Sequence, residues 1–279
     1  MRIGLVGVES SHAEDFLRHL NSQTRHHDIA VTTLWGGDPS RTAELLALVP
    51  DVVAVDSLDQ LIADVDAVIV SDRHGDLHLP HALPAIAARR PVFINKPFTC
   101  TLEDAIALVD AADHARTPLL SASALRWQTE TAMLRQSLAS LPGPFAISGH
   151  GTWYPESPYG GAIFYAIHTI ELLQELLGTG WSNLRLEAGD HPTVRYDAGP
   201  ARVTLQLYPL GPGGSAEFGV SVQSPQLTSD TPIPLGPDYM APVTDRIAAM
   251  LRTGIGMDRE TLLAPIRMMA EIEALLGRR

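Results

Sequence analysis

The sequence contains almost no cysteine and is poor in basic residues. Its single cysteine, Cys100, excludes an internal disulfide framework and any zinc or iron–sulfur site built from cysteines. With 20 Lys+Arg against 32 Asp+Glu, the formal net charge of −12 argues against binding to nucleic acid or to an anionic membrane surface. We therefore expect neither a nucleic-acid partner nor a membrane partner.

Long apolar runs are also missing. The first apolar run, Ile3–Val8, is short, and the acidic Glu9 follows it directly. A secretory signal needs a longer apolar core with a basic flank, and a membrane-spanning helix needs about 20 apolar residues. We expect no such segment and a cytoplasmic location, where a lone cysteine stays reduced.

The 279 residues suffice for about two domains. In the first part of the chain, short apolar runs alternate with amphipathic stretches. Strands are predicted at 3–8, 29–35, 52–55, 67–70, 91–94 and 119–122, with helices at 12–21, 39–48, 58–63, 77–88 and from 101 onward. Strands that are apolar throughout and alternate with helices indicate a parallel sheet covered on both faces. Residues 1–122 are thus predicted to form a Rossmann-like dinucleotide-binding domain.

After residue 123 the pattern changes, and between residues 184 and 222 the strands follow one another without intervening helices. They are predicted at 145–153, 184–188, 193–196, 201–208 and 216–222, with helices at 130–139, 162–177, 239–252 and 259–276. This order indicates an α+β domain, residues 123–279, with a largely antiparallel sheet open on one face. Its C-terminal helices are free to pack back on the first domain. Strands 203–208 and 218–222 carry apolar side chains that we interpret as lying on both faces, which predicts a homodimer or higher homo-oligomer formed through this sheet.

The turn after the first strand is where a dinucleotide pyrophosphate would bind, and the fingerprint for it is Gly-x-Gly-x-x-Gly. Here the turn is Gly7-Val8-Glu9-Ser10-Ser11-His12, so only the first glycine is present. Glu9 stands where the backbone approaches phosphate, and its charge would repel an anion. The hydroxyls of Ser10 and Ser11 either donate to a phosphate or cap the following helix.

The second strand ends in Trp35-Gly-Gly-Asp38-Pro39. An acidic residue about 20 positions after the glycine turn commonly hydrogen-bonds a ribose hydroxyl. Asp38 has two interpretations that the sequence leaves open. It binds the ribose, or it caps the helix that begins at Pro39.

A longer pattern begins at His78. This histidine is followed by Ala82-Leu83 and then by Pro91-Val-Phe-Ile-Asn95-Lys96-Pro97. The pattern resembles the signature of the Gfo/Idh/MocA oxidoreductase family, in which a histidine and an Ala/Leu-rich helix precede a strand ending in Glu-Lys-Pro. The resemblance continues through Thr101–Ala112, Leu125-Arg126-Trp127, Gly160-Gly161, His168-Thr-Ile-Glu171 and the two closing helices, which is nearly the whole chain.

The resemblance implies that the first domain binds NAD or NADP. It also implies that a small-molecule substrate, namely a sugar, cyclitol or related polyol, binds over the sheet of the second domain. Lys96 matches the lysine that hydrogen-bonds the reacting oxygen, and His168 matches the acid/base histidine. A carbinol proton must leave as the hydride leaves, and both side-chain types can titrate near neutrality. The candidate cofactor-binding residues are Gly7, Glu9, Ser10, Ser11, His12, Asp38, Asp72, His78 and Asn95.

Five further residues are candidates for substrate binding. Arg73 and Arg126 either hold a carboxylate or phosphate of the substrate or pair with neighbouring acids. Trp153 and Tyr159 precede the His168 helix and either wall a sugar pocket or pack in the core. Tyr165 is a possible hydroxyl donor beside the catalytic histidine.

The sequence also departs from the family pattern. Phe164 stands where the family has an aspartate four residues before the histidine, and Asn95 replaces the glutamate of Glu-Lys-Pro. Three functions therefore stay open. The leading one is an NAD(P)-dependent oxidoreductase. The others are a redox-neutral lyase, dehydratase or epimerase, in which Lys96 and His168 transfer protons alone, and a catalytically silent sensor or partner subunit.

Four neighbouring residues are of metal-ligand type, namely His74, His78 and His81 together with Asp72. Gly75 is expected to break the chain before the helix, so the three histidines need not share a face. The family resemblance already accounts for His78. We expect no metal.

Overall fold

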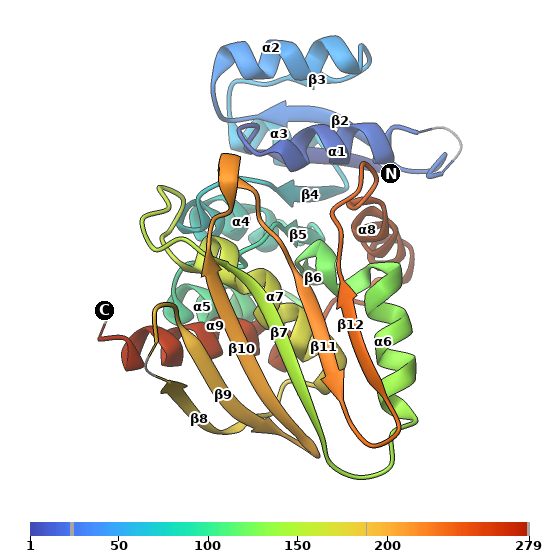
Figure 1. Cartoon of the computed structure of the whole chain (residues 1–279). Helices are drawn as coiled ribbons and strands as arrows, with labels where there is room; N and C mark the ends of the chain where they lie inside the picture. Colours follow the sequence, from blue (N-terminus) through green and yellow to red (C-terminus); the bar gives the residue numbers. More distant parts are fainter. Residues whose placement is uncertain (23–24, 188, 278–279) are drawn as a thin grey trace. The chain divides into compact units, whose positions relative to one another are not determined.

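The structure is a computed structural model that describes residues 1–22, 25–187 and 189–277 (Figure 1). The chain forms two compact units. The first contains Met1–Ala122 and Asp238–Leu262, and the second contains Ser123–Pro237 and the chain from Leu263 onward. The structure thus groups residues 238–262 with the first unit. The assignment of 1–122 and 123–279 as separate domains stays a prediction.

The first unit contains a six-stranded sheet in the order β3-β2-β1-β4-β5-β6, and all its strands are parallel (Figure 1). The strands are β1 (Arg2–Val6), β2 (Ala30–Trp35), β3 (Val53–Ala54), β4 (Ala67–Val70), β5 (Val92–Ile94) and β6 (Leu119–Ser121). Every residue of β4, β5 and β6 is buried, which explains why these runs are apolar throughout. The predicted Rossmann-like fold is confirmed. The strand order reverses between β1 and β4, and open α/β sheets bind their ligands at the carboxyl ends of strands at such a point.

Helices connect these strands. They are α1 (Ser11–Leu20), α2 (Pro39–Leu48), α3 (Leu58–Asp64), η1 (Gly75–Leu77), α4 (His78–Ala87) and α5 (Leu102–Ala115), and α8 (Ala241–Thr253) joins them from later in the chain. The helix predicted at 77–88 is therefore preceded by a separate 3-10 turn. α8 packs on α1. Arg25 donates to both carboxylate oxygens of Asp245, at 3.0 and 2.6 Å, which fastens α8 to the segment after α1.

The second unit contains a six-stranded sheet in the order β12-β11-β7-β10-β9-β8. The strands are β7 (Phe145–Trp153), β8 (Ser182–Glu187), β9 (Thr193–Ala198), β10 (Ala201–Pro209), β11 (Gly219–Gln223) and β12 (Thr228–Pro232). Only the β7–β10 pair is parallel, so the sheet is mixed and largely antiparallel, as predicted. The remaining elements are η2 (Ala124–Trp127), α6 (Thr129–Ala139), α7 (Ile163–Leu177), η3 (Pro212–Gly214) and α9 (Arg259–Leu275), which begins in the first unit.

One face of this sheet is covered by α7 (Figure 1). A Cβ at Gly149 would lie 2.8 Å from a methyl carbon of Leu173, and one at Gly151 would collide with Thr169, so two glycines let the helix approach β7. The apolar residues of β10 are buried, whereas Arg202, Thr204 and Gln206 alternate with them on the opposite face. The interpretation that apolar side chains lie on both faces is therefore wrong, because the outward face is polar.

The strand β12 was not predicted. Its sequence, Thr-Ser-Asp-Thr-Pro, has no apolar alternation, and the strand forms an edge that pairs only with β11. Backbone hydrogen bonds to a neighbour, rather than burial of its own side chains, define it. Among the described residues no helix combines the length and apolar character that a membrane crossing requires.

Candidate active site

The turn between β1 and α1 retains its first glycine for a steric reason. Gly7 has a φ of +79°, and a Cβ there would lie 2.5 Å from the backbone nitrogen of Asp72, at the end of β4. Ser10 caps α1, because its Oγ accepts a hydrogen bond from the backbone nitrogen of His12 at 3.2 Å. Ser11 is the first residue of the helix. Contacts of Ser10 and Ser11 with a phosphate stay a prediction.

His12 and Asn95 connect this turn to the end of β5. Nδ1 of His12 lies 3.0 Å from Oδ1 of Asn95, so the ring nitrogen donates and carries the proton. Burial and then the positive charge of Lys96 lower the pKa of His12 to about 4, against a weaker opposing effect of Asn95. His12 is therefore neutral at pH 7, and it occupies the position of the third glycine of the fingerprint.

Two acidic side chains, those of Asp38 and Glu9, lie at the carboxyl end of β2, and their contacts differ. Oδ1 of Asp38 accepts hydrogen bonds from the backbone nitrogens of Ser40 and Arg41, at 2.8 and 3.1 Å, and so caps α2. Its role at a ribose stays a prediction. The exposed side chain of Glu9 reaches the same end of β2, because a Cβ at Gly37 would lie 2.5 Å from its Oε1.

His78 is fully buried, and its ring nitrogens lie within hydrogen-bond distance of backbone carbonyl oxygens. Nε2 lies 2.9 Å from the carbonyl oxygen of Asp72, and Nδ1 lies 2.8 Å from that of Pro97. Burial lowers the pKa of His78, and the backbone carbonyls oppose that shift. The ring thus ties the end of β4 to the loop that follows Lys96, and a contact of His78 with a cofactor stays a prediction.

Asp72 is buried at the end of β4. Its Oδ2 lies 2.8 Å from Nδ1 of His81, and the ring of His81 packs edge-on against Trp35 with centroids 5.1 Å apart. Arg73 follows Asp72, and its charge also lowers the pKa of His12. Asp72, His81 and Arg73 therefore gather around the reversal point between β1 and β4.

Lys96 lies at the carboxyl end of β5 and is 7% exposed. It is the only lysine in a chain that contains 19 arginines. An ammonium group can be tuned to exchange a proton near neutrality, whereas a guanidinium cannot. The scarcity of lysine is a signal in the sequence that the motif alone does not contain, and the chemical role of Lys96 stays a prediction.

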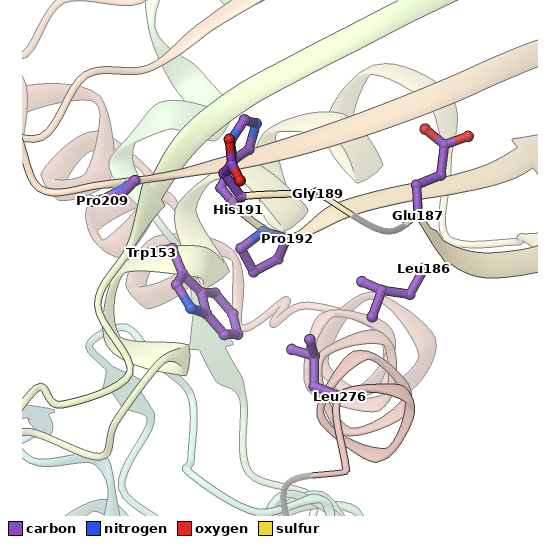
Figure 2. Close-up of a pocket in the computed structure, with 9 residues that line it drawn as sticks. Trp153, Leu186, Glu187, Gly189, His191, Pro192, Pro209 and Leu276 are labelled. Carbon is purple, nitrogen blue, oxygen red and sulfur yellow. The ribbon is translucent and has the colours of Figure 1, made fainter.

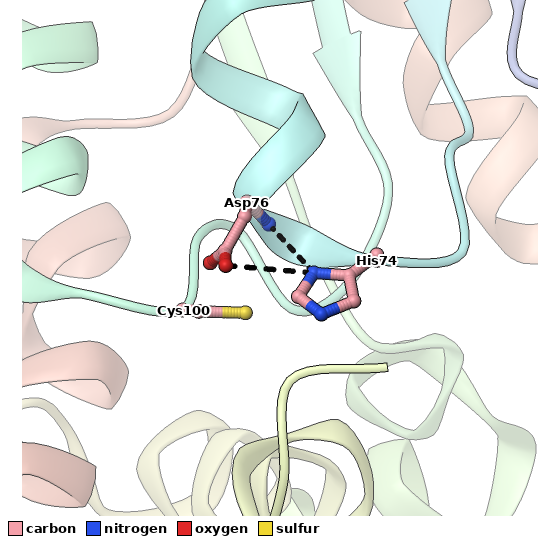
Figure 3. Close-up of side chains that lie close together, drawn as sticks. All are labelled: His74, Asp76 and Cys100. Carbon is pink, nitrogen blue, oxygen red and sulfur yellow. Dashed lines mark hydrogen bonds and ion pairs between the residues drawn. The ribbon is translucent and has the colours of Figure 1, made fainter. Parts of the chain in front are cut away.

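In the part of the chain that the structure describes, Asp72, His74, His78 and His81 do not form one group of converging ligand atoms, and the three histidines have different partners. Instead His74, Asp76 and Cys100 form a group whose ligand atoms lie within 4.8 Å of one another (Figure 3). Nδ1 of His74 accepts from the backbone nitrogen of Asp76 at 3.2 Å. Burial raises the pKa of the Cys100 thiol, and Asp76 raises it further. These contacts hold the turn after β4 against the loop after β5.

In the second unit His168 lies on α7 with a partner that the sequence did not indicate. Its Nδ1 is 2.7 Å from Oγ of Ser123, and its ring packs on Phe218 with centroids 5.3 Å apart. Ser123 Oγ also accepts from the backbone nitrogen of Leu125 at 3.2 Å, and so caps η2. The hydroxyl therefore fixes the orientation of the imidazole from a rigid turn.

Arg126 is buried in an ion pair. Nε donates to Oε2 of Glu171 at 2.7 Å, and Nη1 lies 3.3 Å from Glu175. The same oxygen of Glu171 accepts from the backbone nitrogen of Ser123 at 2.7 Å. The structure thus shows pairing with neighbouring acids, and a contact of Arg126 with substrate stays a prediction.

The aromatic candidates separate into two groups. Tyr159 and Tyr165 both contact Phe164, with ring centroids 5.1 and 5.0 Å apart. Phe164 is thus enclosed by aromatic rings at the position where the family has an aspartate. Trp153 instead lines a pocket of about 340 Å³, and Figure 2 shows its indole ring and the side chain of Leu276 pointing into this pocket.

Comparison with known proteins finds a family model that matches part of the chain. Residues 1–122 match the family model of the Gfo/Idh/MocA oxidoreductases, described as an oxidoreductase family with an NAD-binding Rossmann fold. The chain is 35% identical over 113 residues to the inositol 2-dehydrogenase of Acidothermus cellulolyticus, a match that covers 40% of this chain and 32% of that protein. The chain therefore spans about a third of the length of this curated relative.

Solved structures resemble the chain over nearly its whole length. The WlbA dehydrogenase of Thermus thermophilus, solved with NAD and UDP-GlcNAcA, has a TM-score of 0.78 and 16% identity over 100% of this chain and 95% of its own. GenD2 from gentamicin A biosynthesis, solved with NAD, has a TM-score of 0.82 and 16% identity over 99% and 94%. At this identity the likeness establishes the fold of the chain.

Proposed function

We propose that the protein is an NAD-dependent oxidoreductase that transfers a hydride between the nicotinamide and a carbinol carbon of a cyclitol or sugar-like substrate. The observation that carries the proposal is the placement of the sole lysine, Lys96, buried at the carboxyl end of β5 in an NAD-binding family fold. The curated relative is an inositol 2-dehydrogenase, and a structural neighbour was solved with a nucleotide sugar.

The residues at the carboxyl ends of β1 and β2 fit a dinucleotide. Gly7 leaves room where a Cβ would meet Asp72, and the N-terminus of α1 presents backbone N–H groups to an anion. Glu9 adds a carboxylate at the end of β2. When bound, NAD supplies the hydride acceptor or donor.

The chain's own residues handle the proton. The ammonium of Lys96 donates a hydrogen bond to the substrate oxygen, which stabilises the negative charge that develops there as the hydride leaves. His12 is neutral at pH 7 and therefore adds no second positive charge beside Lys96. We assign a second acid/base role to His168, whose imidazole is oriented by its hydrogen bond with Ser123.

The test is a titration with NADH followed by turnover measurements. We expect NADH to bind and oxidised cofactor to be reduced in the presence of one of a panel of cyclitols and sugars, seen as the absorbance of reduced nicotinamide. Formation of product without net change in the nicotinamide would support the redox-neutral alternative. Absence of binding of NAD(H) and NADP(H) would overturn the proposal.

We also propose that two or more copies of the chain associate through the outward face of the second-unit sheet. In Figure 1 none of the described helices of the second unit lies over this face, whereas α7 covers the other. The polar residues Thr204 and Gln206 would make such an interface hydrogen-bonded rather than apolar. A monomer mass in light scattering at micromolar concentration would contradict association.

A further inference from the structure

The side chain of Glu9 lies over the carboxyl end of β2. A Cβ built on Gly37 would lie 2.5 Å from Oε1 and 3.0 Å from Cδ of Glu9, and it would also collide with Val8. Gly37 has a φ of +98°, and its neighbour Gly36 has a φ of +85°. Gly37 thus leaves open the space that the Glu9 carboxylate occupies.

This location has a defined use in Rossmann folds. An acidic side chain from the end of the second strand accepts hydrogen bonds from the hydroxyls of the adenosine ribose. Positions 36 and 37 have no side chain to offer. The carboxylate of Asp38 is engaged by the backbone nitrogens of Ser40 and Arg41, at 2.8 and 3.1 Å, and by the hydroxyl of Ser40.

The nearby guanidinium group of Arg41 is also hydrogen-bonded to carboxylates. A 2′-phosphate on the ribose is commonly accommodated by an arginine near the same strand end. Arg41, in the first turn of α2, donates to Glu44 at 2.9 Å and to Glu14 at 3.3 Å. Its guanidinium is therefore balanced by two carboxylates, while Glu9 contributes negative charge at the end of β2.

We propose that Glu9 is the residue that distinguishes NAD from NADP. Its carboxylate, delivered from the β1–α1 turn instead of from β2, accepts hydrogen bonds from the ribose hydroxyls of NAD and repels the 2′-phosphate of NADP. The inference rests on the proposed function, and it deepens that function by naming the cofactor and the group that selects it. This role at the ribose differs from the repulsion of the pyrophosphate that the sequence predicts for Glu9.

The experiment compares Glu9→Gln with a matched control. Glu103→Gln makes the same change of charge at an exposed position on α5 of the same unit. Dissociation constants for NADH and NADPH are measured by titration of nicotinamide fluorescence, and folding is checked by circular dichroism. A hydrogen bond to a charged group is worth about tenfold in binding.

We expect the unmodified protein to prefer NADH. Glu9→Gln should reduce this preference about tenfold or more, by weakening NADH binding and strengthening NADPH binding, whereas Glu103→Gln should leave both constants unchanged. Glu9→Asp, which keeps the charge, should keep NADPH weak. An unchanged preference in a Glu9→Gln protein that still binds NADH overturns this inference alone. Failure of the unmodified protein to bind either dinucleotide overturns the proposed function with it.

Discussion

His12 donates a hydrogen bond from Nδ1 to Oδ1 of Asn95, across the 83 residues that separate them in the sequence. The two positions are where the family pattern has a glycine and the glutamate of Glu-Lys-Pro. Both departures from the pattern are therefore explained by one contact. A buried imidazole that is neutral at pH 7 needs a partner that accepts a hydrogen bond without being ionised, and an amide oxygen meets that need.

Replacing the amide of Asn95 by a carboxylate should favour the protonated, positively charged form of the His12 ring. In Asn95→Asp the carboxylate would favour the imidazolium, so the pKa of His12 should rise from about 4 by more than one unit. The measurement is a titration of the imidazole proton signals by NMR, with His12→Gln used to assign the resonance. An unchanged pKa would mean that the hydrogen bond with residue 95 is not present in solution.

The low pKa of His12 predicts that the stability of the protein depends on pH. The unfolded chain binds a proton at His12 near pH 6.5, but the folded chain does so only near pH 4. Between these values the unfolded state holds more protons, so the free energy of unfolding should fall as the pH is lowered, by roughly 3 kcal/mol for this group. Urea midpoints across the window should fall less steeply in His12→Gln. Parallel curves for the two proteins would contradict the prediction.

The local parts of the fold could be predicted from the sequence. The bounds predicted for α2, β4 and β7 coincide with those in the structure. Each has a signal inside its own sequence, namely the Asp38-Pro39 start of α2 and the apolar runs of the two strands. The strand β12 has no such signal, since only its pairing with β11 defines it.

The contacts of the site could not be predicted in the same way. Ser123 and His168 are 45 residues apart, and nothing in either segment indicates the other. The position of the Glu9 carboxylate depends on a side-chain conformation and on the space above Gly37. Motif matching located Lys96, but it gave no information on the neutral ring of His12 beside it.

Arg126 provides a test of structural against substrate-binding roles. Its side chain is 2% exposed and bonded to Glu171, so Arg126→Met should leave a buried carboxylate without its ion pair and destabilise the protein by about 3–5 kcal/mol. Arg135→Met is the matched control, because the side chain of Arg135 is 55% exposed and its pair with Glu175 should contribute less than about 1 kcal/mol. Equal urea midpoints for the two variants would argue that Arg126 is not held structurally and favour a role at the substrate.

Lys96 permits an unusually selective chemical experiment, because it is the only lysine. Reductive methylation with isotope-labelled formaldehyde should modify its amine and the N-terminal amine, and Lys96→Met should remove one of the two signals. The pH titration of that signal by NMR then reports the pKa of the methylated amine of Lys96. Under the proposed proton-transfer role, the pKa should lie below the ordinary lysine value of about 10.4. An ordinary pKa would contradict tuning of the amine toward neutrality.

Turnover measurements on two variants distinguish the positive charge of Lys96 from its ability to transfer a proton. Lys96→Met should reduce turnover by about 10²–10⁴-fold while leaving NADH affinity intact, because the amine is assigned to the substrate oxygen. Lys96→Arg keeps the positive charge but cannot release a proton near neutrality, so it should remain as slow as Lys96→Met. His168→Ala should lose less activity, since water can replace part of its acid/base contribution. Full recovery in Lys96→Arg would show that charge alone is required at this position, and full activity in Lys96→Met would remove the lysine from the mechanism.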